Sequence, residues 1–416
     1  LFNKTGETMK KIVRMSIAAA MMMGVGSISA QAEGLNIVDN VKVKGEIRAR
    51  FENVDQDNAL QNANSITNRL TIGASADLLG LDWLSGYVEM TDVRNINDNY
   101  NSTANGNTGF SVVADPEQTR VTQAYVDVKL IPDTNLRIGR QAINLDNQRF
   151  IGSVDWRQMM QTMDAYTLTN NSIKNLNVFA SYITQRNTVT TASVDTRDVL
   201  VNLSYQVMPE LKATAYAYML GSEHDTYGIA LTGKVAGITY RAEYATQDDS
   251  SIDDSGMGEA QADADYFNVQ LGTNMNGILV GAGYESLSGA DSAGDTAFKT
   301  PYSTLHAHNG WADVFLGNGG QGAGNNDGLE DMSAYIGYKA KGFGLLKVVY
   351  HDFQSEVGST DFGTEVDAIY KNSLAGVTGV KGLNGMVKFA NYDADDYGVD
   401  TTKVWLMSNK KIRTRN

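Results

Sequence analysis

Apolar residues recur at every second position, in segments of roughly ten residues, through most of the chain that follows Ala32. In the segment 41–52, for example, Val41, Ile47 and Phe51 fall on one parity and the charged residues fall on the other. Successive side chains of a β-strand point to opposite faces, so this alternation predicts strands with one apolar and one polar face. A bundle of membrane-spanning helices is excluded, because each span needs about 20 consecutive apolar residues and the mean hydropathy is only −0.28.

Two architectures share this alternation. A soluble sandwich turns its apolar faces inward, whereas a membrane barrel turns them outward to lipid and keeps a polar lumen. The apolar face here is rich in Ala, Gly, Val and Tyr and lacks the bulky pairs that fill a sandwich core, while the polar face carries both signs of charge along whole strands. Both observations favour the barrel.

The connections between the strand segments alternate between tight and long. Tight turns are predicted at 79–82, 131–134, 170–174, 207–210, 235–237, 275–277 and 340–342. Longer polar links are predicted at 53–65, 94–118, 143–160, 187–195, 247–262, 288–330 and 355–361. Bacterial outer-membrane barrels have an even number of strands, short periplasmic turns and long extracellular loops. We therefore predict an all-β, transmembrane antiparallel β-barrel of about 18 strands, with 16 as the alternative count.

The N-terminal region has the pattern of an export signal. From Met9 the chain carries Lys10, Lys11 and Arg14, then an apolar stretch over 17–28, then an A-x-A site that ends at Ala32. A basic region, a short apolar region and a small-residue cleavage site together indicate a secretory signal peptide. We predict that residues 1–32 are an upstream extension and signal peptide, and that residues 33–416 form a single outer-membrane barrel domain.

Composition excludes several functions. The formal charge of −14 argues against nucleic-acid binding, which needs a basic stripe. The absence of Cys excludes disulfides, thiolate metal sites and Cys nucleophiles. His306 and His308 with Asp313 could suggest a metal site, but this loop is rich in Gly and has no further His, so a structural role is favoured. We find no Ser–His–Asp constellation and expect neither an enzyme nor a cofactor.

Two blocks are more specific than the barrel pattern. The first runs Ile138-Gly139-Arg140-Gln141, then Asp146 to Gly152, then Trp156-Arg157-Gln158, Gln161-Thr162 and Asp164-Ala165. The second contains His306, His308, Gly310 to Asp313, and Gly328-Leu329 with Asp331. Both resemble the alginate-export family of porins, which implies an outer-membrane channel of about 18 strands but no particular solute. One departure is the C-terminus, where residues 412–416 lack the terminal aromatic residue that the barrel-assembly machinery reads.

The link 143–160 is unusually apolar for an exposed loop, since it includes Ile143, Phe150, Ile151, Trp156 and Met159. A loop of this composition must bury itself, and we expect it to fold into the barrel and narrow the channel. The alternatives are a cap over the barrel mouth and a contact between copies of the chain.

Charged residues of the first block are the candidates for a pore constriction: Arg137, Arg140, Asp146, Arg149, Asp155, Arg157 and Asp164. Arginine presents a rigid fork of donors, and charge at a constriction filters solutes by charge and size. The plainer interpretation is that Arg–Asp pairs fasten the loop to the wall. The parity of Arg140 matches that of Leu136 and Ile138, so either the strand bulges there or Arg140 lies above the lipid band. The predicted lumen wall includes Lys42, Arg48, Arg50, Arg69, Lys129 and Arg241, with Lys212, Lys347 and Lys388 on the same polar face.

The resulting prediction is a porin of the bacterial outer membrane that passes small hydrophilic solutes or ions passively through a narrowed lumen. Its partners would be outer-membrane lipid and lipopolysaccharide, small solutes and the barrel-assembly machinery, and either a monomer or a homo-oligomer suits its size. The alternative is a dedicated exporter of an acidic exopolysaccharide such as alginate, which would need a strongly basic constriction and a periplasmic partner. A structural or adhesive surface protein with a blocked lumen is a third hypothesis.

Overall fold

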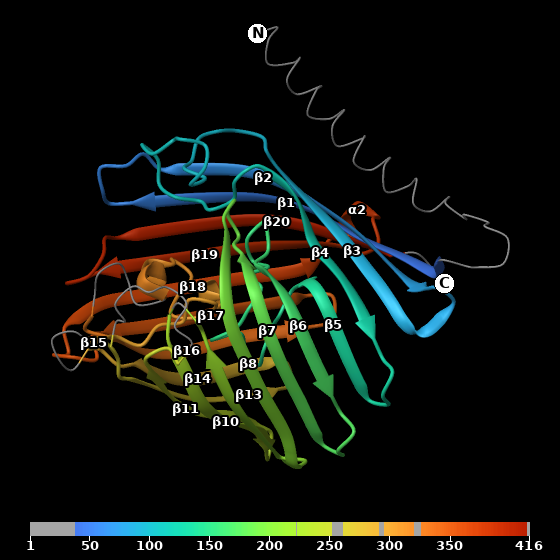
Figure 1. Cartoon of the computed structure of the whole chain (residues 1–416). Coiled ribbons are helices and arrows are strands. Elements are labelled where there is room, and N and C mark those ends of the chain that lie inside the picture. The colour runs from blue at the N-terminus through green and yellow to red at the C-terminus, as the bar shows by residue number, and fades with distance from the viewer. Residues whose placement is uncertain (1–37, 222, 252–260, 291–294, 320–325, 414–416) are drawn as a thin grey trace, which may run out of the picture.

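The computed structural model describes residues 38–413, apart from 222, 252–260, 291–294 and 320–325. Eighteen of its strands form one antiparallel sheet in sequence order, and the pairing of β1 with both β2 and β20 closes that sheet into a barrel. Figure 1 shows the long tilted strands around a lumen that contains several loop segments. The predicted signal peptide lies outside the described residues.

The barrel strands follow the chain as printed here: β1 (Val38–Gln56), β2 (Ala63–Leu78), β3 (Leu81–Asn95), β4 (Gln118–Val128), β5 (Thr134–Gln141), β6 (Thr162–Asn170), β7 (Leu176–Asn187), β8 (Ser193–Met208), β9 (Leu211–Met219), β10 (Asp225–Val235), β11 (Ile238–Asp248), β13 (Ala264–Met275), β14 (Ile278–Leu287), β16 (Leu329–Ala340), β17 (Gly344–Gln354), β18 (Asp361–Ser373), β19 (Leu383–Ala394) and β20 (Thr401–Arg413). Smaller elements are the parallel pair β12 (Gln261–Ala262) and β15 (Asp295–Thr296), the 3-10 turns η1 (Leu305–Ala307) and η2 (Val314–Gly319), and the short helix α2 (Ala375–Thr378). The predicted count of 18 is confirmed.

The alternation has the orientation of a membrane barrel. In β1 the apolar Ile47 is 49% exposed on the outer face, whereas its neighbours Arg48 and Arg50 are buried toward the lumen. The same holds across the barrel, where Ile336 of β16 is 60% exposed. A soluble protein would bury such residues, so this outward apolar band is the surface that contacts lipid.

Tight and long connections separate to opposite ends of the barrel. Residues 79–80, 236–237 and 276–277 make two-residue turns, and in the last of these Asn276 and Gly277 both have positive φ (53° and 92°). Two positive φ values are what a type I′ hairpin turn requires, which explains the Asn-Gly sequence. The β18–β19 connection is an exception at this end, because it is longer and contains α2. We call the two ends of the barrel the short-turn end and the long-loop end.

No helix within the described residues is long and apolar enough to cross a membrane.

Candidate functional site

The loop 142–161, which connects β5 to β6, crosses the lumen. One part of it contacts β1 and β2: Arg48 donates to the backbone oxygen of Asp155 (2.8 Å) and Arg50 to that of Trp156 (2.6 Å). Arg69 of β2 donates to the Asp155 carboxylate (2.6 Å). The inward fold expected from the loop's apolar content is confirmed, and three of the predicted lumen-wall arginines hold it.

Other residues of the same loop reach the opposite wall. Asp146 accepts a hydrogen bond from Arg241 of β11 (2.6 Å). Arg149, which is fully buried, pairs with Glu285 of β14 (3.0 Å) and donates to Asn309 (2.9 Å). The loop is therefore fastened at both sides of the lumen by charge-assisted hydrogen bonds, which are stronger than neutral ones.

The apolar residues of the loop pack inside the barrel. Phe150 lies 5.3 Å from the rings of both Tyr216 and Tyr266, and 6.0 Å from Phe298. Ile151 and Met159 are almost completely buried. This buried cluster explains why an apparently exposed loop has a core-like composition.

Two further loops enter the lumen, which the sequence analysis did not predict. From the loop 96–117, the buried Asp115 pairs with Arg50 and accepts a hydrogen bond from the backbone of Gln158 (2.7 Å). From the loop 288–328, the backbone N–H groups of Trp311 and Ala312 donate to Glu365 of β18 (2.5 and 2.7 Å). Both loops are polar and rich in Asn or Gly, so their composition does not distinguish a docked loop from an exposed one.

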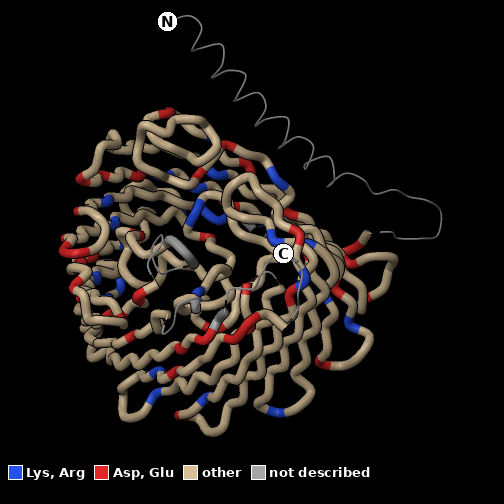
Figure 2. Tube along the Cα trace, turned by 60° about the vertical axis from the view of Figure 1, so that its left-hand side comes forward, with Lys and Arg blue, Asp and Glu red and all other residues tan. Residues whose placement is uncertain are grey.

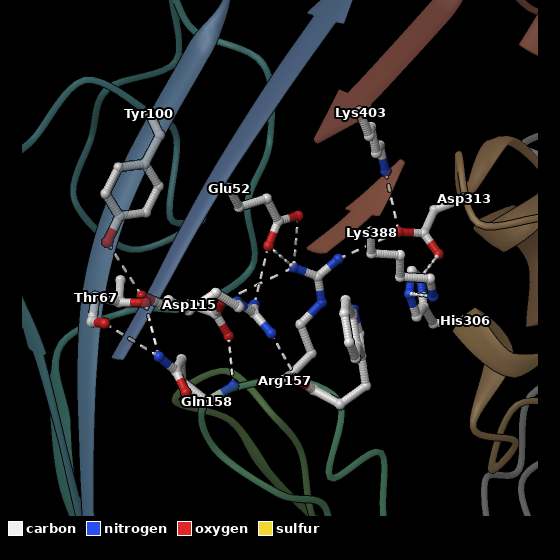
Figure 3. Close-up of polar contacts among 12 residues, drawn as sticks. Glu52, Thr67, Tyr100, Asp115, Arg157, Gln158, His306, Asp313, Lys388 and Lys403 are labelled. Atoms are coloured by element: carbon white, nitrogen blue, oxygen red, sulfur yellow. Dashed lines mark hydrogen bonds and ion pairs between the residues drawn. The ribbon is translucent and has the colours of Figure 1, made fainter. Parts of the chain in front are cut away.

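Arg157 connects these loops. Its guanidinium donates to both carboxylate oxygens of Glu52 (3.2 and 3.3 Å) and lies 3.4 Å from Asp313. Asp313 in turn pairs with Lys403 of β20 (3.0 Å) and with His306 (2.6 Å). Figure 3 shows this network running from Asp115 through Glu52 and Arg157 to Asp313. Through these contacts, the network joins the loops to one wall of the barrel.

Lys388 of β19 lies at the end of this network, within a cage of rings. Its Nζ is 3.7 Å from the ring centroid of Trp311, 4.4 Å from Trp156 and 5.5 Å from Trp405. These are three of the four tryptophans of the protein, and they come from two loops and one strand. A cation over aromatic faces is attracted by the ring quadrupoles.

His306 takes part in this buried network. We assign Nδ1–H as the donor to Asp313 and Nε2 as the acceptor from Lys388, 2.6 Å away. Mainly because the ring is buried, the pKa of His306 is lowered to about 3, so the ring is neutral at pH 7. Among the described residues, no group of three or more His, Cys, Asp or Glu side chains could hold a metal ion.

The other predicted site residues lie in different places. Arg137 forms a two-pronged pair with Asp127 on the lumen wall (2.8 and 2.9 Å). Arg140 and Asp164 also form a two-pronged pair (2.7 and 2.8 Å), but they share an outward hollow with Ile138 and the exposed Tyr166. Their predicted position in the lumen is therefore wrong. The physical reason is strand parity, which places Arg140 on the outer face just beyond the apolar rows.

Two of the predicted wall lysines lie near the short-turn end. Lys129 follows the last residue of β4 and belongs to the β4–β5 turn, so its position on the wall is wrong. Lys42 is exposed near the beginning of β1. In contrast, Arg241 is buried on the wall, where it pairs with Glu243 of the same strand and with Asp146 of the inward loop.

Cavities lie beside the inward loops and at the short-turn end of the described barrel. One of about 400 Å³ lies between the segment 307–311 and the wall from β11 to β17. A second, of about 390 Å³, lies between the loop 142–146 and the wall from β5 to β9. A third, of about 860 Å³, opens at the short-turn end against β16 to β20. Such volumes suit small molecules.

Comparison with known proteins agrees with this architecture. Residues 39–227 match the family model described as alginate export; this segment includes the first sequence block, whereas the second block lies outside it. The structure is similar to OpdO of Pseudomonas aeruginosa (12% identity, 91% of this chain and 99% of that chain covered, TM-score 0.71). It is also similar to OccAB4 of Acinetobacter baumannii (15% identity, 91% and 99% covered, TM-score 0.66).

A third similar structure is the outer membrane protein OpdK of Pseudomonas aeruginosa (12% identity, 90% and 99% covered, TM-score 0.69), which is also known with vanillate. At these identities the similarity establishes the fold. A search of the curated proteins found no match.

Proposed function

Since this chain carries the sequence pattern of the alginate-export family over residues 39–227 and has the barrel of an outer-membrane porin, we propose that it is a passive channel for small hydrophilic solutes or ions. The apolar outer band places the barrel in the bacterial outer membrane, in contact with its lipids. No chemical reaction belongs to this proposal.

One observation carries the proposal: three inward loops divide the lumen and leave a cavity of about 390 Å³ beside the loop 142–161 and one of about 400 Å³ beside the segment 307–311. Cavities of this size hold a small molecule and not a polymer of many residues. The similar structure of OpdK with vanillate, a small solute, is consistent with that limit.

We propose that the loop 142–161 sets the constriction, and the structure suggests two roles for its charges. Arg149 and Arg157 are 0% and 10% exposed and paired, which supports the role of fastening the loop. Asp155, with 52% of its side chain exposed, and Arg137 on the wall, 30% exposed, are accessible to a passing solute. Arg140 and Asp164 are left out of this constriction.

The exporter of an acidic polysaccharide is the weaker hypothesis. It requires a strongly basic constriction, whereas the central arginines are matched by Glu46, Glu52, Asp115, Glu243 and Glu285. The proposal also includes three partners: lipopolysaccharide, the barrel-assembly machinery and further copies of the chain. The outward apolar band is compatible with each of them.

The test is single-channel recording of the refolded chain in a planar bilayer. We expect stepwise conductance that small hydrophilic solutes reduce when added at millimolar concentration. A folded barrel, identified by its heat-modifiable migration on gels, that conducts no ions would overturn the proposal and favour a structural surface protein. Block by long acidic oligosaccharides, without block by small solutes, would favour the exporter.

A further inference from the structure

Lysines gather inside the barrel near its short-turn end. Lys212 is the second residue of β9, Lys234 and Lys339 are next to last in β10 and β16, and Lys371 is the third from last in β18. All of them have the parity of the lumen face. We use the name lysine collar for these four residues together with Lys347 and Lys411.

The lysine collar differs from the arginines deeper in the lumen. Lys212 and Lys411 lie 3.8 and 4.0 Å from Asp146 and Glu46, with side chains 37% and 68% exposed. Lys339 and Lys371 are exposed and line the cavity of about 860 Å³ at the short-turn end. Lys347 lies over the ring of Tyr335 (4.2 Å). An exposed ammonium on a flexible stem remains available to ions, whereas a buried paired guanidinium does not.

Asp146 and Glu46 oppose only Lys212 and Lys411 of the lysine collar, and two further carboxylates at the same end have other partners. Asp127 is engaged by the two-pronged pair with Arg137. Asp77 accepts a hydrogen bond from Asn40 (2.7 Å) at the end of β2. The lumen mouth at the short-turn end therefore carries an excess of positive charge.

The long-loop end carries the opposite charge. Asp361, Asp393, Asp395, Asp396 and Asp400 lie at the β17–β18 and β19–β20 connections. Repulsion from Asp361, followed by weaker contributions from burial and from the other aspartates, raises the pKa of the exposed Asp395. In Figure 2 acidic segments are frequent along the loop-bearing ends of the strands, and basic segments lie on several hairpin turns, with residues of the other sign among both. The charge is thus separated along the barrel axis.

We propose that this separation makes the channel rectify, so that ions pass more readily at one polarity of voltage than at the other. This inference rests on the proposed function. When the long-loop side is positive, cations enter from the acidic end and anions enter from the lysine collar, so both accumulate in the lumen. The reverse polarity draws both out of it. Charged mouths concentrate counter-ions in this way.

The experiment compares currents at equal positive and negative voltages through the full chain in a planar bilayer. The chain contains no Cys, so a Thr360→Cys variant at an exposed loop position, treated with a charged thiol reagent on one side, reports which way the barrel has inserted. We expect larger currents with the long-loop side positive at 0.1 M salt, where the Debye length is about 10 Å. At 1 M salt, where it is about 3 Å, the asymmetry should disappear.

Variants assign the effect to the lysine collar. The triple variant Lys339→Gln, Lys347→Gln, Lys371→Gln should lose most of the asymmetry and shift the reversal potential toward cation selectivity. The matched control changes Lys129, Lys174 and Lys381 to Gln, all exposed in connections at the short-turn end, and should keep both properties. Symmetric currents in the unmodified channel, or an unchanged collar variant, would overturn the inference. A folded barrel without conductance would instead contradict the proposed function.

Discussion

Lys388 donates a hydrogen bond of 2.6 Å to His306, and this contact joins a barrel strand to a loop that begins nearly a hundred residues earlier in the chain. The His306 ring also stacks on Trp156 of the loop 142–161, with centroids 4.2 Å apart. Two inward loops and the wall therefore meet at one ammonium group.

We predict that Lys388→Met loosens both loops. The substitution keeps the volume but leaves His306 without its donor, and an unmade buried hydrogen bond costs about 1–3 kcal/mol. Tryptophan emission should shift to longer wavelength, since three of the four tryptophans surround Lys388, and open-channel current noise should rise. Lys381→Met, at an exposed position, serves as the control. Equal emission spectra in the two variants would argue that the hydrogen bond between Lys388 and His306 does not hold the loops in place.

Arg149→Ala and Arg157→Ala should each raise the single-channel conductance and shift selectivity toward cations. The reason is release of the loop, because removal of Arg157 takes one cationic partner from the buried Glu52 and Asp313. Arg50 still pairs with Glu52 and Lys403 with Asp313, so the cost should lie below the roughly 3–5 kcal/mol of a fully unpaired buried charge. The double variant Arg157→Met, Glu52→Gln should recover part of the loss in thermal stability. Conductance that stays at the wild-type level in both alanine variants would remove the loop 142–161 from the constriction.

Acid should open the channel. Burial lowers the pKa of His306 to about 3 and that of His308 to about 4, below the unperturbed value of about 6.5. A released loop therefore takes up protons that the docked loop does not, and docking weakens as the pH falls below about 6.5, by up to about 1.4 kcal/mol per unit and per histidine. Recordings from pH 7.5 to pH 5 should show more frequent large openings. In the His306→Gln variant this pH dependence should be smaller.

Arg140→Gln combined with Asp164→Asn should leave conductance and selectivity unchanged, because this pair lies on the outer face. Some loss of thermal stability is expected, since the Arg140 guanidinium also donates to the backbone oxygen of Val121 (3.2 Å) and so ties β4 to β5 and β6. A change in reversal potential of the same size as that of Arg157→Ala would place the pair in the ion path after all.

Strand parity explains which arginines were correctly predicted to face the lumen and which were not. Arg48, Arg50 and Arg69 face the lumen as their parity predicted, and each contacts the inward loop. Arg140 shares the parity of Leu136 and Ile138, and the structure follows this parity. Arg140 was predicted to face the lumen because it belongs to the first sequence block. Strand parity predicted its orientation better than membership of that block.

Period-two alternation predicted a barrel of about 18 strands, with 16 as the alternative, and the apolar composition of the loop 143–160 predicted that this loop is buried. Both are local properties that each segment carries alone. No local pattern predicted which walls that loop contacts, that two polar loops join it, or that Trp156, Trp311 and Trp405 enclose Lys388. Those contacts connect residues far apart in the chain, such as Arg157 and Glu52 at a separation of 105 residues. They depend on how closure of the barrel brings distant strands to face one another across the lumen, and no local pattern encodes that geometry.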